Sequence, residues 1–249
     1  MQEGLCCAVA REPWPLPARH ELTCSYLVAP GGGAVAAVSY FPGITYNTNR
    51  LKGADVPTSL QQLLEPTYKG RIASTPYGAW FNYLGAAEGW GAQRMTDYLS
   101  QFADQVAGLI RCNEKERLLT GEFDVLAIDC SHGEALLMKR DGAPIDVSLA
   151  ADIPYVGTRY ISIPRGAPHP SVAKLWIDFL MSREAQDILY ELELADNIAV
   201  PGSRSARDVE AVQGARGKLI RVDIEFYERN DEAELNRLLT MSQRMLRKQ

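Results

Sequence analysis

Short apolar runs alternate with amphipathic segments through the middle of the chain. GRIAST, AGLIRC and FDVLAID, at 70–75, 107–112 and 123–129, are each long enough for one short strand. Between them, GAQRMTDYLSQFADQV has apolar residues at the spacing of a helix. This alternation predicts an α/β domain with a mainly parallel sheet. The helical positions are Met95, Tyr98, Leu99, Phe102 and Val106.

Prolines, glycines and capping residues predict where helices begin and end. A helix is expected to begin at Pro76, and another to stop at Gly142. Ser182 is suited to cap a third, with Glu184 in its first turn. The segment PSVAKLWIDFLMS is expected to be an amphipathic helix that packs through one face. That face consists of Val172, Leu175, Trp176, Phe179 and Leu180.

The first part of the chain, residues 1–34, has a different character. It is rich in proline and glycine, contains PGGG near its end and shows little periodicity, so an irregular arm is expected. Its start, MQEGLCCAVAREPWPLPARH, lacks a basic stretch followed by an unbroken apolar run. A secretory signal is therefore not predicted from these residues.

Composition excludes several classes of protein. The chain has 249 residues, 46% hydrophobic and 23% charged, as in an ordinary soluble globular protein. A net charge of -5 argues against nucleic-acid binding, which normally needs a basic patch. The five cysteines, at 6, 7, 24, 112 and 130, have no CxxC spacing and an odd count, so a zinc ribbon and a full disulfide framework are not predicted. We expect them to be structural or incidental.

A cluster of polar residues follows the apolar run FDVLAI, in the sequence DCSHGE. Ser131 and His132 would begin a helix, whose free amides favour a carboxylate or phosphate. Asp129 and His132 could instead ligate a metal ion with a further group. Cys130 and His132 could form a nucleophile and base, although such pairs usually come from distant parts of a sequence. No glycine-rich phosphate loop, GxSxG or HExxH motif supports an enzyme.

The order of several segments resembles the type II periplasmic solute-binding proteins of ABC importers, in particular their ferric-iron-binding branch. The segments are ITYNTNRL, PTSLQQLLEPTYKGRIAST, LLTGEFDVLAI, KRDGAPIDV, ISIPRGAPHPSVAKLWIDFLMSREAQDIL and the terminal helix. They extend from about Val35 to the end. The resemblance implies a two-lobed α/β fold that closes over its ligand by hinge motion.

The resemblance also implies a division of the chain. Residues 35–46 and 156–249 would form the first lobe with the hinge strands, and 47–155 the second lobe. The family normally has a longer segment before the first crossing strand, which we do not find in this sequence. We therefore expect an incomplete first lobe, in a truncated or mis-started product.

Members of the ferric branch bind iron through two adjacent tyrosines after the strand that corresponds to FDVLAI. This chain has Asp129, Cys130, Ser131 and His132 there instead, so an anionic or organic solute is expected rather than iron. Arg159 and Tyr160, on the returning strand, would also border the cleft. Alternatively, the aromatic candidates are core residues and Ser74 or Thr75 is a helix cap. The expected ligand contacts are Tyr46, Asn47, Ser74, Thr75, Tyr77, Trp80, Asp129, Ser131, His132 and Tyr155.

The resemblance thus implies a periplasmic or extracellular protein that hands a small solute to a membrane permease. It would be a monomer, would have no resident cofactor and would perform no covalent chemistry. One alternative is a ferric-iron-binding protein of the same fold, with the ferric ion as transported ligand. The other is a cytoplasmic effector-binding module, as in LysR-type regulators.

Overall fold

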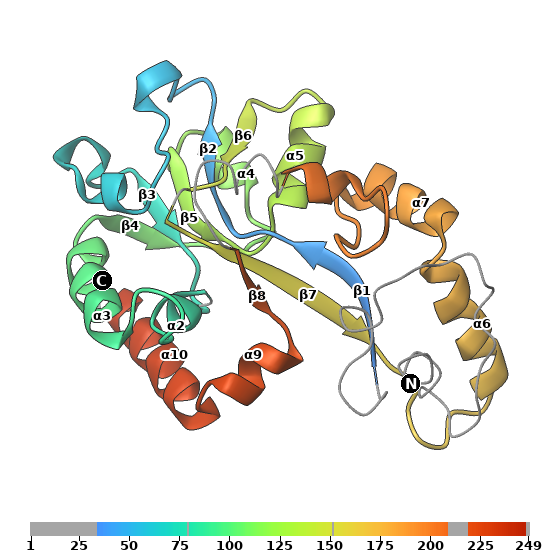
Figure 1. The fold of residues 1–249 in the computed structure, drawn as a ribbon. Helices are drawn as coiled ribbons and strands as arrows, with labels where there is room; N and C mark the ends of the chain where they lie inside the picture. Colours follow the sequence, from blue (N-terminus) through green and yellow to red (C-terminus); the bar gives the residue numbers. More distant parts are fainter. Residues whose placement is uncertain (1–33, 79, 151, 209–218, 248–249) are drawn as a thin grey trace.

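The computed structural model describes residues 34–247 apart from 79, 151 and 209–218, and these residues form two β-sheets (Figure 1). The irregular arm predicted for 1–34 lies almost wholly outside the described residues. The smaller sheet has the order β1-β7-β8 and the larger one the order β4-β3-β5-β2-β6. The strands are β1 (Val35–Tyr40), β2 (Gly43–Asn47), β3 (Ile72–Ser74), β4 (Val106–Leu109), β5 (Val125–Asp129), β6 (Ile145–Ser148), β7 (Tyr155–Ile161) and β8 (Ile220–Val222).

The five-stranded sheet is mixed, which corrects the expectation of a mainly parallel sheet. Strand β3 is parallel to β4 and β5, as predicted for strands linked by helices. Strand β2 is antiparallel to both β5 and β6. The physical reason is that β2 does not come from the strand–helix alternation but enters directly from β1 and inserts between β5 and β6.

The two sheets are joined by two passages of the chain. The chain leaves β1 and enters β2 after only Phe41 and Pro42, and it returns between β6 and β7. Strands β1 and β7 pair antiparallel, with Val38 opposite Arg159. In Figure 1, β1 and β7 lie side by side in the smaller sheet, and their arrows point in opposite directions.

The helices are α2 (Phe81–Leu84), α3 (Ala92–Ala103), α4 (Glu116–Leu119), α5 (His132–Arg140), α6 (Pro170–Leu180), α7 (Arg183–Glu193), α9 (Ile224–Arg229) and α10 (Glu232–Leu246). The predicted caps are confirmed at two of them: Ser182 Oγ accepts from Ala185 N at the start of α7, and α5 ends before Gly142, whose φ is +91°. None of the helices in the described ranges combines the length and apolar character needed to cross a membrane.

The helix expected at Pro76 begins at Phe81 instead. Pro76 and Tyr77 form a turn, and Gly78 after them has a φ of +60°, which a right-handed helix cannot accommodate. The following helix, α3, is as predicted, because Met95, Tyr98, Leu99 and Phe102 are all buried. The fifth predicted position, Val106, lies in β4.

The C-terminal helix α10 packs against α2 and α3, on the side of the five-stranded sheet (Figure 1). A Cβ at Gly85 would lie 2.9 Å from Leu238 Cδ1, so the two segments touch closely. The sequence placed this helix with the first lobe. The difference arises because the apolar face of a helix shows that it packs, but not against which sheet.

The predicted apolar face of α6 is largely exposed; of its five residues, Leu180 alone packs, partly buried, against a small apolar cluster. Trp176 is 59% exposed, and Val172, Leu175 and Phe179 are exposed beside it. Within the described part of the chain, no residue of α6 is buried. These four side chains share one face of a helix, whereas exposed apolar residues on a soluble domain are normally scattered singly.

Substituting Trp176 is therefore expected to have little effect on stability. Trp176→Ser should change the free energy of unfolding by about 0.5 kcal/mol or less, since an exposed side chain gains little from folding. Met181→Ser, at a buried position just beyond α6, is the control and should cost about 2 kcal/mol. Urea unfolding of both variants measures this, and a similar loss in both would show that the face of α6 is covered.

Candidate functional site

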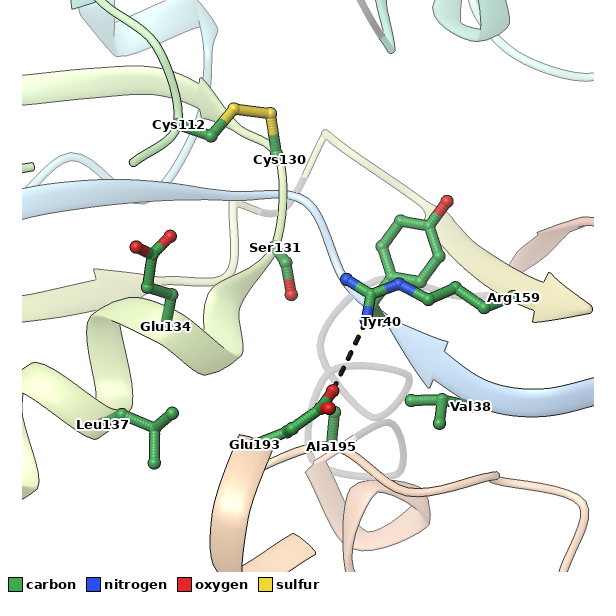
Figure 2. Close-up of a pocket in the computed structure, with 10 residues that line it drawn as sticks. All are labelled: Val38, Tyr40, Cys112, Cys130, Ser131, Glu134, Leu137, Arg159, Glu193 and Ala195. Atoms are coloured by element: carbon green, nitrogen blue, oxygen red, sulfur yellow. Dashed lines mark hydrogen bonds and ion pairs between the residues drawn. A yellow bond between two sulfur atoms is a disulfide. The ribbon is translucent and has the colours of Figure 1, made fainter. Parts of the chain in front are cut away.

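A cavity of about 270 Å³ lies between the two sheets (Figure 2). One wall comes from β1, β7 and the end of α7, and the opposite wall from α5 and the two loops that carry the disulfide. Its volume is slightly below the range of about 300–1,000 Å³ that is usual for ligand pockets, so it suits a small solute. The lining residues are Val38, Tyr40, Cys112, Cys130, Ser131, Glu134, Leu137, Arg159, Glu193 and Ala195.

Arg159 supplies the positive charge of the first wall. Its Nη1 lies 3.4 Å from Glu193 Oε2, and its guanidinium lies 5.3 Å from the centre of the Tyr40 ring. Figure 2 shows the guanidinium reaching from β7 toward Glu193. Burial raises the pKa of Tyr40, which Arg159 partly offsets, so the phenol stays neutral and can donate a hydrogen bond. An anion that enters the cavity can compete with Glu193 for the guanidinium.

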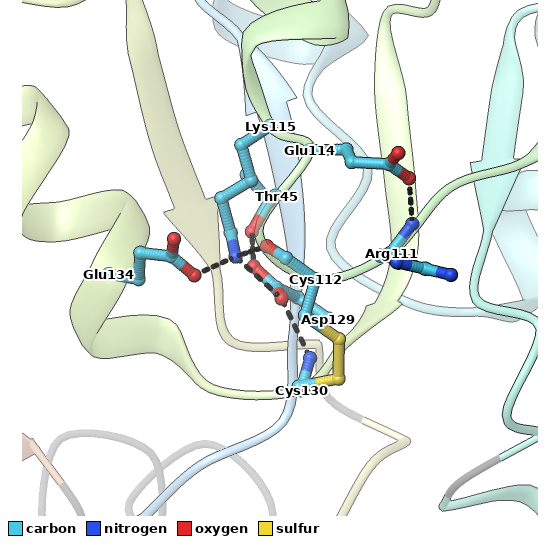
Figure 3. The surroundings of a disulfide bond; sticks show 8 residues. All are labelled: Thr45, Arg111, Cys112, Glu114, Lys115, Asp129, Cys130 and Glu134. Atoms are coloured by element: carbon cyan, nitrogen blue, oxygen red, sulfur yellow. Dashed lines mark hydrogen bonds and ion pairs between the residues drawn. A yellow bond between two sulfur atoms is a disulfide. The ribbon is translucent and has the colours of Figure 1, made fainter.

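The opposite wall is held together by a buried ammonium (Figure 3). Lys115 is 1% exposed, and its Nζ lies 3.1 Å from Asp129 Oδ1 and 2.7 Å from Glu134 Oε2. It also donates to the carbonyl oxygen of Cys112. Glu134 therefore lines the cavity while Lys115, which is buried in the wall, balances its negative charge.

Asp129 lies inside this wall and does not line the cavity. It is fully buried, and its carboxylate accepts hydrogen bonds from Thr45 Oγ1 at 2.6 Å and from Cys130 N at 2.7 Å. Burial raises the pKa of Asp129, while Lys115 and the hydrogen bonds act in the opposite direction. These bonds fix the end of β5 and the start of α5.

Helix α5 directs its N-terminus toward the other wall. Ser131 is its N-cap and lines the cavity, and among the described residues its side chain makes no capping hydrogen bond. The amides of the first turn have no intrahelical partner, as at any helix start, and the first of them, His132 N, donates to Phe41 O at 3.0 Å. A Cβ at Gly133 would collide with the carbonyl oxygen of Glu193, so this glycine permits the close approach of α5 and α7.

Cys112 and Cys130 form a disulfide across 18 residues, with Cα atoms 5.9 Å apart. A single bridge is compatible with the expectation that the cysteines are structural or incidental, but this pairing was not predicted. Cys112 follows β4 and Cys130 follows β5, and both strands are parallel to β3. Because carboxyl ends of parallel strands meet at one edge of a sheet, these two positions come together, and this signal was present in the sequence.

The metal alternative finds limited support in the geometry. Within the described ranges, the one group of His, Cys, Asp and Glu close enough to hold an ion is Cys112, Asp129 and Cys130. It does not include His132, and its two sulfur atoms are bonded to each other. The carboxylate of Asp129 is occupied by Lys115 and Thr45. As described, this group offers no thiolate to a metal ion.

Of the ten predicted ligand contacts, Ser131 lines the cavity, and Asp129 and His132 lie directly behind it. The other seven are not brought to this cavity. Trp80 and Tyr155 are in the main core, where Tyr155 Oη donates to Tyr83 O at 2.6 Å. Asn47, Ser74 and Thr75 are buried, Tyr46 is half-buried and Tyr77 is exposed. Whether they contact a solute remains a prediction.

Arg159 is a second lining residue that the sequence indicated, through its position on the returning strand. Tyr40, Glu134 and Glu193 were missed. Glu134 could have been found, because it lies in the first turn of the helix that Ser131 begins. Glu193 had no such signal, since it comes from the far end of α7.

His132 makes stability depend on pH. Burial lowers its pKa from 6.5 to about 4, and its Nδ1 accepts from Phe41 N at 3.2 Å, so the folded protein holds a neutral ring. Because the folded pKa is depressed, the stabilisation is present above pH 6.5 and is lost as the pH falls through about 4. Urea unfolding from pH 7 to 4 should show this loss. His132→Gln should flatten the curve, and an unchanged slope would contradict the assignment.

Comparison with known proteins finds relatives of this chain both by sequence and by fold. The family model described as bacterial extracellular solute-binding protein matches residues 26–224. An uncharacterized protein of Haemophilus influenzae is 27% identical over 205 residues, which are 74% of this chain and 55% of that protein. The chain thus spans about half the length of this relative.

Solved structures share the fold. Iron-bound HitA from Pseudomonas aeruginosa matches with a TM-score of 0.66 and 15% identity, over 89% of this chain and 73% of that one. AfuA from Actinobacillus pleuropneumoniae, with fructose-6-phosphate bound, matches with a TM-score of 0.59 and 22% identity, over 88% and 70%. This chain therefore covers about three quarters of each of them, and the shared fold agrees with the two-lobed α/β class expected from the sequence.

Proposed function

The chain belongs to the family of bacterial extracellular solute-binding proteins, and on that premise we propose that it captures a small anionic organic solute for an ABC importer. The solute would bind in the cavity between Arg159 and the N-terminus of α5. The two lobes would close over it by hinge motion and present it to a membrane permease. Binding involves no covalent step.

The observation that carries this proposal is the charge arrangement of the cavity. Arg159 faces a helix N-terminus across it, and both favour a carboxylate or phosphate group. The neutral phenol of Tyr40 and the hydroxyl of Ser131 add donors for further oxygen atoms. AfuA, a structure of the same fold, holds fructose-6-phosphate, a ligand of this chemical class.

Ferric ion is the weaker candidate. A hard cation needs anionic oxygen ligands. The two carboxylates that line the cavity are already paired, Glu134 with Lys115 and Glu193 with Arg159. An incoming cation would have to displace both partners, whereas an anion has to displace only Glu193.

We place the hinge where the chain passes between the two sheets. Residues 35–46 and 156–249 would then supply the first lobe with the hinge strands, and 47–155 the second, although α10 packs against the second. The disulfide supports a location outside the cytoplasm, because such bonds persist in oxidising compartments. We propose that the protein acts there as a monomer.

Binding experiments test the proposal. Inorganic phosphate, fructose 6-phosphate, small carboxylates, a polyamine and ferric ion are screened by thermal shift, and stabilising solutes are titrated by calorimetry. An anion should stabilise the protein, and Arg159→Met should weaken its binding by about tenfold to a hundredfold, because a charge-assisted hydrogen bond is lost. Arg165→Met, at an exposed position outside the cavity, is the control. Stabilisation by ferric ion or the polyamine alone would refute the proposal.

A further inference from the structure

We propose that the Cys112–Cys130 pair is a reversible thiol–disulfide modification site in the wall of the solute cavity, and that its reduction weakens solute binding. The effect on affinity rests on the proposed function. The modification itself and its effect on the shape of the wall do not. A small dithiol or a protein dithiol would be the reductant, and a disulfide of either kind the oxidant.

The position of the bridge makes it accessible. Both cysteines are half-exposed, and both line the cavity beside Ser131 (Figure 2). The bridge joins two loops at the surface of the site, where a thiol can reach it.

The surroundings favour exchange at a defined sulfur. Attack of a thiolate on the Cys112 sulfur breaks the bridge and releases the Cys130 sulfur as a thiolate. Cys130 directly precedes the N-cap of α5, and the positive end of that helix stabilises a leaving thiolate. A carboxylate oxygen of Asp129 and both sulfurs lie within 4.8 Å of one another, and Lys115 Nζ lies 3.1 Å from Asp129 Oδ1, which offsets the carboxylate charge.

The exchange balances without another reactant. The first thiol of the dithiol forms a mixed disulfide with Cys112, and its second thiol then displaces Cys112 and closes the reductant into its own disulfide. The two electrons pass from the dithiol to the protein pair. The two protons of the dithiol end on Cys112 and Cys130. Reoxidation by a disulfide is the same sequence reversed.

Reduction reaches the cavity through the two loops that the bridge connects. On one side, the carbonyl of Cys112 accepts from Lys115 Nζ, which also holds Glu134 (Figure 3). On the other side, the amide of Cys130 donates to Asp129, directly before the cap of α5. Without the bridge, both loops gain conformational freedom. Solute binding then has to order them again, and this lowers the affinity for the solute.

The modification is tested first, on the full chain and without any solute. The protein is treated with dithiothreitol under native conditions and quenched with iodoacetamide, and alkylation of Cys112 and Cys130 is followed by peptide mass spectrometry. Both should become alkylated while the circular dichroism spectrum is unchanged, and oxidised glutathione should restore the bridge. Alkylation only under unfolding conditions would overturn the proposal.

The coupling is tested on the oxidised protein, the reduced protein and Cys112→Ser/Cys130→Ser. Amide hydrogen exchange in the peptide covering Ser131 to Leu137 should be faster in the reduced protein and in the double variant than in the oxidised protein, whether or not a solute is known. In the same two forms, the affinity for fructose 6-phosphate or inorganic phosphate should be about tenfold lower. Dithiothreitol should not change the affinity of the double variant.

These outcomes separate the two proposals. Unchanged exchange in α5, or equal affinity in all forms, would overturn the coupling. If none of the screened anions, the small carboxylates included, binds any form, the proposed function fails, while alkylation and hydrogen exchange still decide whether the pair is a modification site that shapes this wall.

Discussion

Lys115→Met is expected to destabilise the protein by about 3–5 kcal/mol at neutral pH, because removing one partner of a buried ion pair leaves an uncompensated charge. Lys115 is 1% exposed, and Asp129 beside it is fully buried. The carboxylate retains hydrogen bonds from Thr45 and Cys130, but these do not replace a positive charge. Urea unfolding at pH 7 measures the loss.

The pH dependence of this variant distinguishes lost charge from lost packing. Burial already raises the pKa of Asp129, and Lys115 opposes that rise, so the variant should have a still higher folded pKa. A raised carboxyl pKa means that the folded state takes up a proton more readily than the unfolded state, so stability increases as the pH falls. The deficit of the variant should therefore shrink between pH 7 and pH 4.5.

Two further variants serve as controls. Lys139→Met removes an ion pair with Asp146 at 2.6 Å that is largely exposed, and it should cost at most about 1 kcal/mol. Lys115→Met/Asp129→Asn removes both charges and should recover part of the loss. A deficit in Lys115→Met that does not change with pH would show that packing, rather than the charge of Asp129, is responsible.

The sequence predicted the fold well where local pattern decides it. The strands at β3, β4 and β5, the buried face of α3 and the cap at Ser182 follow from periodicity and capping chemistry. The resemblance to solute-binding proteins is also confirmed by the family model, and the fold is shared with iron-bound HitA. The direction of β2 and the partner of α10 were not predictable in this way, because both depend on contacts between segments far apart in the chain.

The site was predictable only in part, for a related reason. The sequence identified the strand-to-helix loop at Ser131, because a polar cluster after an apolar run marks a strand end. It also treated Asp129 as an available ligand, whereas the structure pairs it with Lys115, 14 positions earlier in the printed sequence. Glu193 reaches the cavity from the end of α7, which is far along the chain from Ser131. Such pairings are properties of the fold and leave no local pattern.

Removing the disulfide with Cys112→Ser/Cys130→Ser is expected to lower the free energy of unfolding by about 3 kcal/mol, because the bridge restricts the unfolded chain. The bonded residues are 18 positions apart, a loop for which chain entropy predicts this magnitude. The unfolded variant is more open, so the dependence of its stability on urea should also be steeper. Because substituting either cysteine removes the whole bridge, Cys112→Ser and Cys130→Ser should each lower the free energy of unfolding by about as much as the double substitution does. Losses that add between the two single variants would mean that the side chains, and not the bridge, provide the stability, and in that case the loops around Ser131 would be held by the Lys115 contacts alone.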